Sequence, residues 1–161
     1  MTEQGTFEGR RAEILLVEDN LGDELLALRA FKNSRIANNF TVAGSAEEAW
    51  AMLKQEGAFA GQCLPDLILL DLNLPKMSGR RFLQMIKTDA GLNPIPVVVM
   101  TSSEAAIDVK SCLDLQASAY IVKPMDLDAF GEVVERIELE YFTRAEAPMP
   151  DTARPAESTL T

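Results

Sequence analysis

Residues 66–71 read Asp66-Leu67-Ile68-Leu69-Leu70-Asp71, four consecutive apolar residues between two aspartates. A short run that is apolar throughout is typical of a central strand in a parallel sheet, because helices cover both faces of such a strand. We therefore expect a buried strand here. Asp71 would then stand at the carboxyl end of that strand.

Strand-like and helix-like segments alternate on both sides of this run. We expect the other strands near residues 13–18, 40–43, 97–100 and 118–122. We expect helices near residues 21–31, 45–57, 82–86, 103–115 and 127–142, where apolar residues recur at helical spacing. This alternation predicts an α/β fold: a flavodoxin-like, doubly wound, five-stranded parallel sheet in the order 2-1-3-4-5, with helices on both faces.

The first and last of these helices have the clearest local signals. Asn20 is a candidate N-cap, with Asp23 and Glu24 in the favourable first turn. Apolar spacing in the first helix is given by Leu21, Leu25, Leu28 and Phe31. The expected inward stripe of the last helix is Leu127, Phe130, Val134, Ile137 and Tyr141. Leu139 and Phe142 lie off this stripe. Two alternative roles are open for them: a contact in a dimer, or a cover for the bottom of the core.

The length of 161 residues and the hydrophobic content of 47% suit one domain with a tail. We assign residues 1–11 to a polar N-terminal segment, 12–143 to the folded domain and 144–161 to a flexible C-terminal tail. We expect no second domain and no output domain after the last helix. The absence of a signal peptide and of any apolar run of about 20 residues predicts a soluble cytoplasmic protein without a membrane partner.

Charge and residue content exclude several classes of function. The formal net charge of −10 argues against nonspecific nucleic-acid binding and against docking on anionic lipid. The chain contains no histidine, which excludes histidine-based catalytic triads, histidine-ligated zinc and a phosphohistidine carried by this chain. The two cysteines, Cys63 and Cys112, suggest a reducing compartment rather than a disulfide.

Polar side chains directly follow four of the expected strands. They are Glu18 and Asp19, Asp71, Thr101 and Ser102, and Lys123. Each has an ordinary explanation when taken alone, such as a helix cap, a loop opener or a solvated lysine. Because the carboxyl ends of such strands lie along one edge of the sheet, however, the six side chains are expected to meet there.

The residue types fit phosphate and metal chemistry. Carboxylate oxygens suit Mg²⁺. Each pair of carboxylates about 4 Å apart repels by about 4 kcal/mol at an effective dielectric constant near 20, and a divalent cation together with Lys123 would offset this repulsion. A carboxylate nucleophile can form an acyl phosphate, and Asp71 has the central position.

Five motifs, in matching order and spacing over about residues 12–142, resemble the receiver domain of two-component response regulators. They are Glu18-Asp19-Asn20, Leu70-Asp71-Leu72-Asn73-Leu74-Pro75, Gly79, Met100-Thr101-Ser102 and Lys123-Pro124. The resemblance implies that Asp71 accepts a phosphoryl group from a histidine of a partner kinase. It also implies a Mg²⁺ or Mn²⁺ site formed by Asp19, Asp71 and the Asn73 backbone carbonyl, with Glu18 acting through water.

The resemblance assigns roles to the remaining site residues. Thr101 would hydrogen-bond the phosphoryl oxygen, the Ser102 backbone N–H would contribute, and Lys123 would form an ion pair with it. Thr101 and Tyr120 match the switch pair that alters the face formed by the fourth helix, fifth strand and last helix. The alternative for Tyr120 is an edge-strand aromatic that packs on a helix. Ser78 stands where many receivers have Asp.

Two stretches, residues 18–23 and 71–76, are more similar to stand-alone regulators associated with bacterial phytochromes. This implies a bacteriophytochrome histidine kinase as phosphodonor, a downstream protein or histidine phosphotransferase as target, and a homodimer. We expect a signalling protein rather than an enzyme. The alternatives are a receiver-like scaffold that is not phosphorylated and an aspartyl-phosphate phosphatase, although Asn73 stands where such a phosphatase has its second acid.

Overall fold

The computed structural model describes residues 9–61, 63–72, 74, 77–101, 117–123 and 126–142. Five parallel strands form one sheet with the order β2-β1-β3-β4-β5. The strands are β1 (Ala12–Val17), β2 (Asn38–Ala43), β3 (Leu67–Asp71), β4 (Val97–Thr101) and β5 (Ala119–Val122). The predicted flavodoxin-like sheet and its strand order are confirmed.

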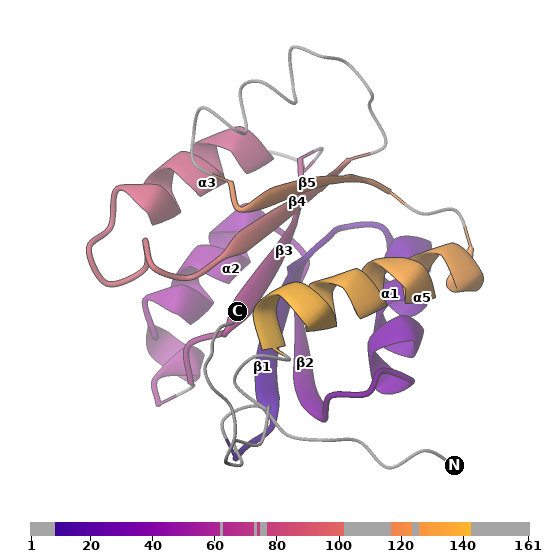
Figure 1. Cartoon of the computed structure of the whole chain (residues 1–161). Coiled ribbons are helices and arrows are strands. Elements are labelled where there is room, and N and C mark those ends of the chain that lie inside the picture. Colours follow the sequence, from indigo (N-terminus) through magenta and orange to yellow (C-terminus); the bar gives the residue numbers. More distant parts are fainter. Residues whose placement is uncertain are drawn as a thin grey trace.

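Helices cover both faces of the sheet (Figure 1). On one face lie α1 (Leu21–Lys32) and α5 (Leu127–Ile137); on the other lie α2 (Ala46–Leu53) and α3 (Gly79–Lys87). A short 3-10 turn, η1 (Gly57–Phe59), follows α2, and a π-helical turn, η2 (Glu138–Phe142), follows α5. The helix expected at residues 103–115 lies outside the described residues. Among the described helices, none has the length and apolar content needed to cross a membrane.

The central strand β3 has both of its faces in the core. Leu67 and Leu69 pack in the cluster under α1 and α5, whereas Ile68 and Leu70 pack in the cluster under α2 and α3. All four side chains are fully buried. Full burial of such a side chain contributes about 1.5–3 kcal/mol, so these four residues hold β3, and Asp71 at its end, firmly in place.

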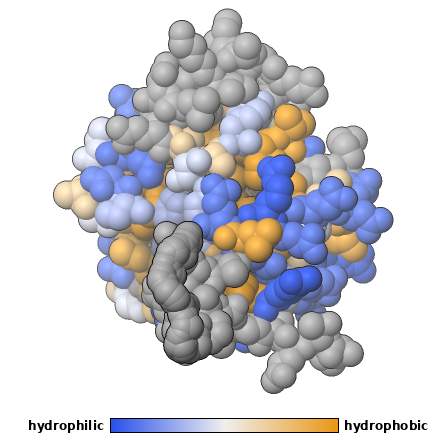
Figure 2. Space-filling view, viewed as in Figure 1, coloured by the Kyte–Doolittle hydropathy of each residue, from blue (hydrophilic) through white to orange (hydrophobic). Residues whose placement is uncertain are grey.

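The helix α1 packs on the sheet through two alanines and two larger side chains, Phe31 and the half-buried Leu26. Ala27, Ala30 and Phe31 are buried, whereas Leu21, Leu25 and Leu28 are 64%, 50% and 39% exposed. These leucines are spaced four and three residues apart and therefore share one side of the helix. Apolar spacing thus predicts the helix but not the buried face. The described surface in Figure 2 likewise mixes hydrophobic residues with hydrophilic ones.

The end of α5 departs from the expected pattern. Phe130, Val134 and Ile137 are buried as expected, but Phe142, expected off the stripe, is also buried, with 1% exposure. This burial agrees with one of the two alternatives left open for Phe142, a cover for the bottom of the core. The π-helical turn accounts for it, since its hydrogen bonds span five residues and place Phe142 on the side of Ile137. Phe142 therefore belongs to the core, whereas Leu139 is 70% exposed.

The same wide turn buries a carboxylate. Glu138 is 5% exposed, and its Oε2 accepts hydrogen bonds from the backbone N–H groups of Arg35 at 2.7 Å and Ile36 at 3.0 Å. A buried carboxylate is stable only when such donors replace water. Glu138 therefore ties the end of α5 to the loop between α1 and β2.

A close backbone contact holds the chain after β3. The Gly79 N–H donates to the Leu72 carbonyl at 3.2 Å. A Cβ at position 79 would lie 2.7 Å from the Asp71 carbonyl oxygen and 2.7 Å from Leu72 Cα. Both obstacles are backbone atoms that cannot turn away. Glycine is therefore required at position 79. Because this first residue of α3 has no side chain, the helix can lie close to Leu72, the residue that follows Asp71.

We predict that Glu138→Ala lowers the free energy of unfolding by about 2–3 kcal/mol, because two backbone donors lose their acceptor. Urea denaturation measures the change. Glu140→Ala, which removes an exposed carboxylate of the same turn, should change stability by less than about 0.5 kcal/mol. Equal losses in the two variants would contradict the anchoring role of Glu138.

We also predict opposite effects for two glycine-to-alanine changes. Gly79→Ala should destabilise the fold by about 1–3 kcal/mol through the backbone clash. Gly131→Ala, inside α5, should stabilise it by about 0.5–1 kcal/mol, because apart from its chain neighbours and the backbone of its own helix no atom lies within 4 Å of the added Cβ. Thermal unfolding of both variants beside the parent tests the pair, and a stable Gly79→Ala variant would refute the steric argument.

Candidate phosphoacceptor and metal site

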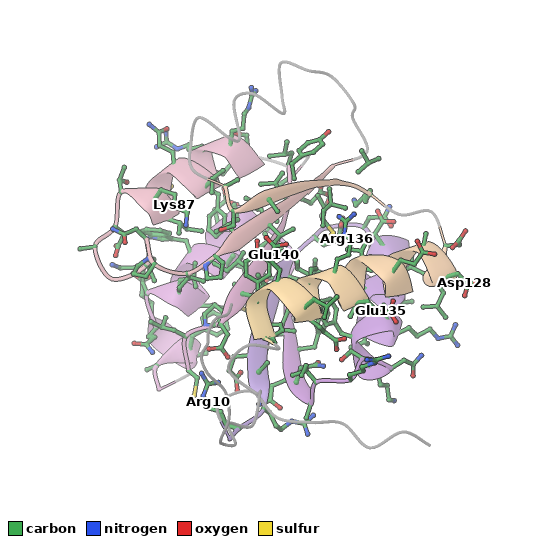
Figure 3. All side chains as sticks on the ribbon, viewed as in Figure 1. Arg10, Lys87, Asp128, Glu135, Arg136 and Glu140 are labelled. Carbon is green, nitrogen blue, oxygen red and sulfur yellow. The ribbon has the colours of Figure 1, made fainter. Side chains whose placement is uncertain are left out.

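Three strand ends and the start of one helix place charged groups at a single edge of the sheet. Asp71 is the last residue of β3, Glu18 directly follows β1, and Lys123 directly follows β5. Asp71 and Glu18 are 2% and 1% exposed. The opposite edge carries a separate ion pair between Arg10, labelled in Figure 3, and Asp66, with a 2.7 Å contact.

The ammonium group of Lys123 is shared by three carboxylates. Its Nζ lies 2.9 Å from Glu18 Oε1, 3.2 Å from Asp71 Oδ2 and 2.8 Å from Asp23 Oδ2. Lys123 is itself largely buried, with 14% side-chain exposure. At these distances the positive charge of the lysine offsets the repulsion between the buried carboxylates.

Asp23 is a member of this cluster that the sequence did not assign to it. Its position in the first turn of α1 suggested only a favourable interaction with the helix dipole. The available signal was its place five residues after Glu18, on a helix that begins at the same sheet edge. With 35% side-chain exposure, Asp23 forms the solvent side of the cluster.

Hydrogen bonds of the first loop fix both Glu18 and Asp23. The Asn20 N–H donates to Glu18 Oε2 at 3.0 Å, and the Asp23 N–H donates to Asn20 Oδ1 at 2.9 Å. Asn20 is therefore the N-cap of α1, as its sequence position predicted. Together with the two contacts to Lys123, these bonds close a ring through Glu18, Asn20, Asp23 and Lys123.

The three expected acidic metal ligands lie close enough to serve one cation. Glu18, Asp19 and Asp71 each offer a carboxylate oxygen, and these oxygens lie within 4.8 Å of one another. Oxygens bound to Mg²⁺ at about 2.1 Å stand about 3–4 Å apart, so only a small contraction is needed. The donor set, formed by oxygen alone, therefore fits a hard divalent cation such as Mg²⁺ or Mn²⁺.

Other predicted site residues are only partly described. Asn73, Ser102 and Pro124 lie outside the described residues. Thr101 is the last residue of β4, paired with Val122 of β5, which places its backbone at the same edge of the sheet. Tyr120 on β5 is half-buried and packs against the core cluster of α2 and α3. Ser78 caps α3, because its Oγ accepts the Arg81 N–H at 3.2 Å.

Burial changes the acidity of the cluster. It raises the pKa of the Glu18 carboxyl to about 7; Lys123 and the Asn20 N–H oppose this rise, and the charge of Asp71 adds to it. Burial alone would lower the pKa of Lys123, but its bonds to Asp23 and Glu18 and the charge of Asp71 raise it above its usual value. Lys123 thus stays charged while Glu18 titrates.

We predict a stability change with pH that depends on Glu18. Because its folded-state pKa of about 7 lies above the reference value of 4.5, the folded state binds this proton more tightly, and stability falls as pH rises through this window. In EDTA, the free energy of unfolding of the parent should therefore decrease relative to Glu18→Gln between about pH 5 and 8, by at most about 3 kcal/mol.

Because the chain contains no histidine, no imidazole group titrates in the same pH window as Glu18. Urea titrations at several pH values measure the difference. Glu140→Gln, which alters an exposed carboxylate, is the matched control for the amide substitution. A constant difference between the parent and Glu18→Gln across the window would contradict the prediction.

Comparisons with known proteins agree with this geometry. Residues 14–135 match the response regulator receiver domain family. Response regulator Rcp1 of Synechocystis sp. is 39% identical over 125 residues, which cover 78% of this chain and 85% of that protein. The crystal structure of a phosphorylated cyanobacterial phytochrome response regulator, RcpA, has a TM-score of 0.78 and 40% identity, covering 88% of this chain and 99% of the other.

The solved Mn²⁺-bound form of response regulator Rcp1 has a TM-score of 0.75 and 35% identity, covering 90% of this chain and 99% of the other. The family match spans most of the chain and includes Glu18, Asp71 and Lys123, the residues gathered at the sheet edge. This chain therefore belongs to the response regulator receiver domain family.

Proposed function

We propose that this receiver accepts a phosphoryl group on Asp71 from a histidine of a partner kinase. The observation that carries the proposal is the cluster around Asp71, in which Lys123 lies 3.2 Å away and oxygens of Glu18 and Asp19 lie within 4.8 Å of an Asp71 oxygen. The 161 residues contain no histidine, so the donor histidine lies outside this sequence.

The chemistry is an in-line transfer between two nucleophiles. An Asp71 carboxylate oxygen forms a bond to phosphorus, while the bond from phosphorus to the donor imidazole nitrogen breaks and its electron pair stays on that nitrogen. Mg²⁺ or Mn²⁺, held by Glu18, Asp19, Asp71 and Asn73, would neutralise charge on the phosphoryl oxygens. Lys123 supplies a second positive charge, and Thr101 and Ser102 would contribute hydrogen bonds.

The proposed partners follow from the relatives and from one exposed surface. The phosphorylated relative RcpA is a cyanobacterial phytochrome response regulator, which favours a bacteriophytochrome kinase as the donor. Leu21, Leu25 and Leu28 give α1 an exposed apolar side directly after Glu18 and Asp19, where a protein donor has to approach. We also propose a homodimer, to which the exposed Leu139 would contribute.

Phosphorylation would alter binding on the face of residues 103–115, β5 and α5. In this proposal Thr101 moves toward the phosphoryl group and Tyr120 turns further inward, which changes the affinity for a downstream protein or a histidine phosphotransferase. Tyr120 is half-buried, so it has room to become more buried. Couplings of about 1–3 kcal/mol are typical of such switches and suffice to redirect a partner without a change of fold.

Intact-mass spectrometry with acetyl phosphate tests the proposed acceptor. The parent should gain the mass of one phosphoryl group in Mg²⁺ and none in EDTA, and Asp71→Asn should gain none. Asp128→Asn is the matched control, since Asp128 is exposed at the start of α5 (Figure 3), and this variant should be labelled like the parent. Labelling of Asp71→Asn at the parent's rate would refute the assignment.

A further inference from the structure

We propose that Asp23 is a positioning residue for Lys123. Its carboxylate holds the ammonium group toward α1 and thereby leaves oxygens of Glu18 and Asp71 available to a divalent cation. The contact with Asp23 Oδ2, at 2.8 Å, is the shortest of the three around Lys123 Nζ; the contact with Asp71 Oδ2, at 3.2 Å, is the longest. The inference deepens the proposed function and rests on it for the metal site.

Asp23 is held in place independently of the lysine. Its backbone N–H donates to Asn20 Oδ1, and the Asn20 N–H donates to Glu18 Oε2. A Cβ at position 22 would lie 3.3 Å from Asn20 Oδ1, so glycine leaves the cap undisturbed. The carboxylate therefore extends from a rigid first helical turn, as required of a group that positions another.

A divalent cation and the Lys123 ammonium compete for the same carboxylates. Glu18 and Asp71 belong both to the lysine's partners and to the group of oxygens that can hold a metal ion. A divalent cation there repels the ammonium and competes for the same oxygens. Asp23, unlike Glu18 and Asp71, is not in the metal-ligand group. It can therefore remain paired with Lys123 when the other two carboxylates bind the cation.

The test measures Mn²⁺ affinity by electron paramagnetic resonance of free Mn²⁺. Asp23→Asn should weaken binding by about threefold to tenfold, in the range of a partly exposed ion pair strengthened by its neighbours. Asp23→Glu, which keeps the charge, should restore part of the affinity. Glu24→Gln removes one charge from the adjacent residue of the same turn and should change the affinity by less than about twofold.

A second background separates positioning from a general charge effect. In Lys123→Met, the further change Asp23→Asn should alter Mn²⁺ affinity no more than Glu24→Gln does, because the residue that Asp23 positions is gone. In the metal-free parent, the side-chain ¹⁵N resonance of Lys123 should show an ammonium protected from exchange. This protection should be reduced in Asp23→Asn and retained in Glu24→Gln.

Each outcome decides the proposal. Equal weakening by Asp23→Asn and Glu24→Gln, or the same effect of Asp23→Asn with and without Lys123, would overturn it, as would a parent that binds no Mn²⁺. If acetyl phosphate labels Asp71 while Asp23→Asn binds Mn²⁺ normally, the positioning role fails and the proposed function stands. If the affinities differ as expected but Asp71 is never labelled, the proposed function fails and the positioning role stands.

Discussion

One ammonium group allows four acids to occupy a single edge of this sheet. Glu18, Asp23 and Asp71 all lie within 3.2 Å of Lys123 Nζ, with Asp19 close by. Each pair of carboxylates at about 4 Å would repel by about 4 kcal/mol at an effective dielectric constant near 20, which a marginally stable domain cannot sustain several times over. The long lysine side chain also lets β5, two strands away from β3, deliver the compensating charge.

The apolar core makes this charge cluster a preorganised site. Residues 67–70 are fully buried between two helical layers, and the close contact at Gly79 restrains the chain just after Asp71. Asp71 therefore cannot move away from the neighbouring carboxylates. Packing of the core and the ion pairs of Lys123 together keep the charges in position, and such a preorganised arrangement can stabilise a transferring phosphoryl group.

The sequence predicted what depends on patterns along the chain and missed what depends on neighbours in space. The apolar run of residues 67–70 indicated β3, and the strand ends indicated Glu18, Asp71 and Lys123. The exposure of Leu21, Leu25 and Leu28 could not be predicted, because apolar spacing does not say that Ala27 and Ala30 fit closer to the sheet. Likewise, the π-helical turn that buries Phe142 has no signature in one sequence, and the lysine contact of Asp23 is indicated there by nothing more than its place at the start of a helix at this sheet edge.

The first two turns of α1 join the pocket to the surface. Asp23 faces Lys123 at 2.8 Å, while Leu21 and Leu25, two residues away on either side, are exposed. A protein that covers these leucines therefore contacts the turn that carries Asp23. If such binding changes the ion affinity of the pocket, linkage requires that the ion change the affinity of that protein by the same factor.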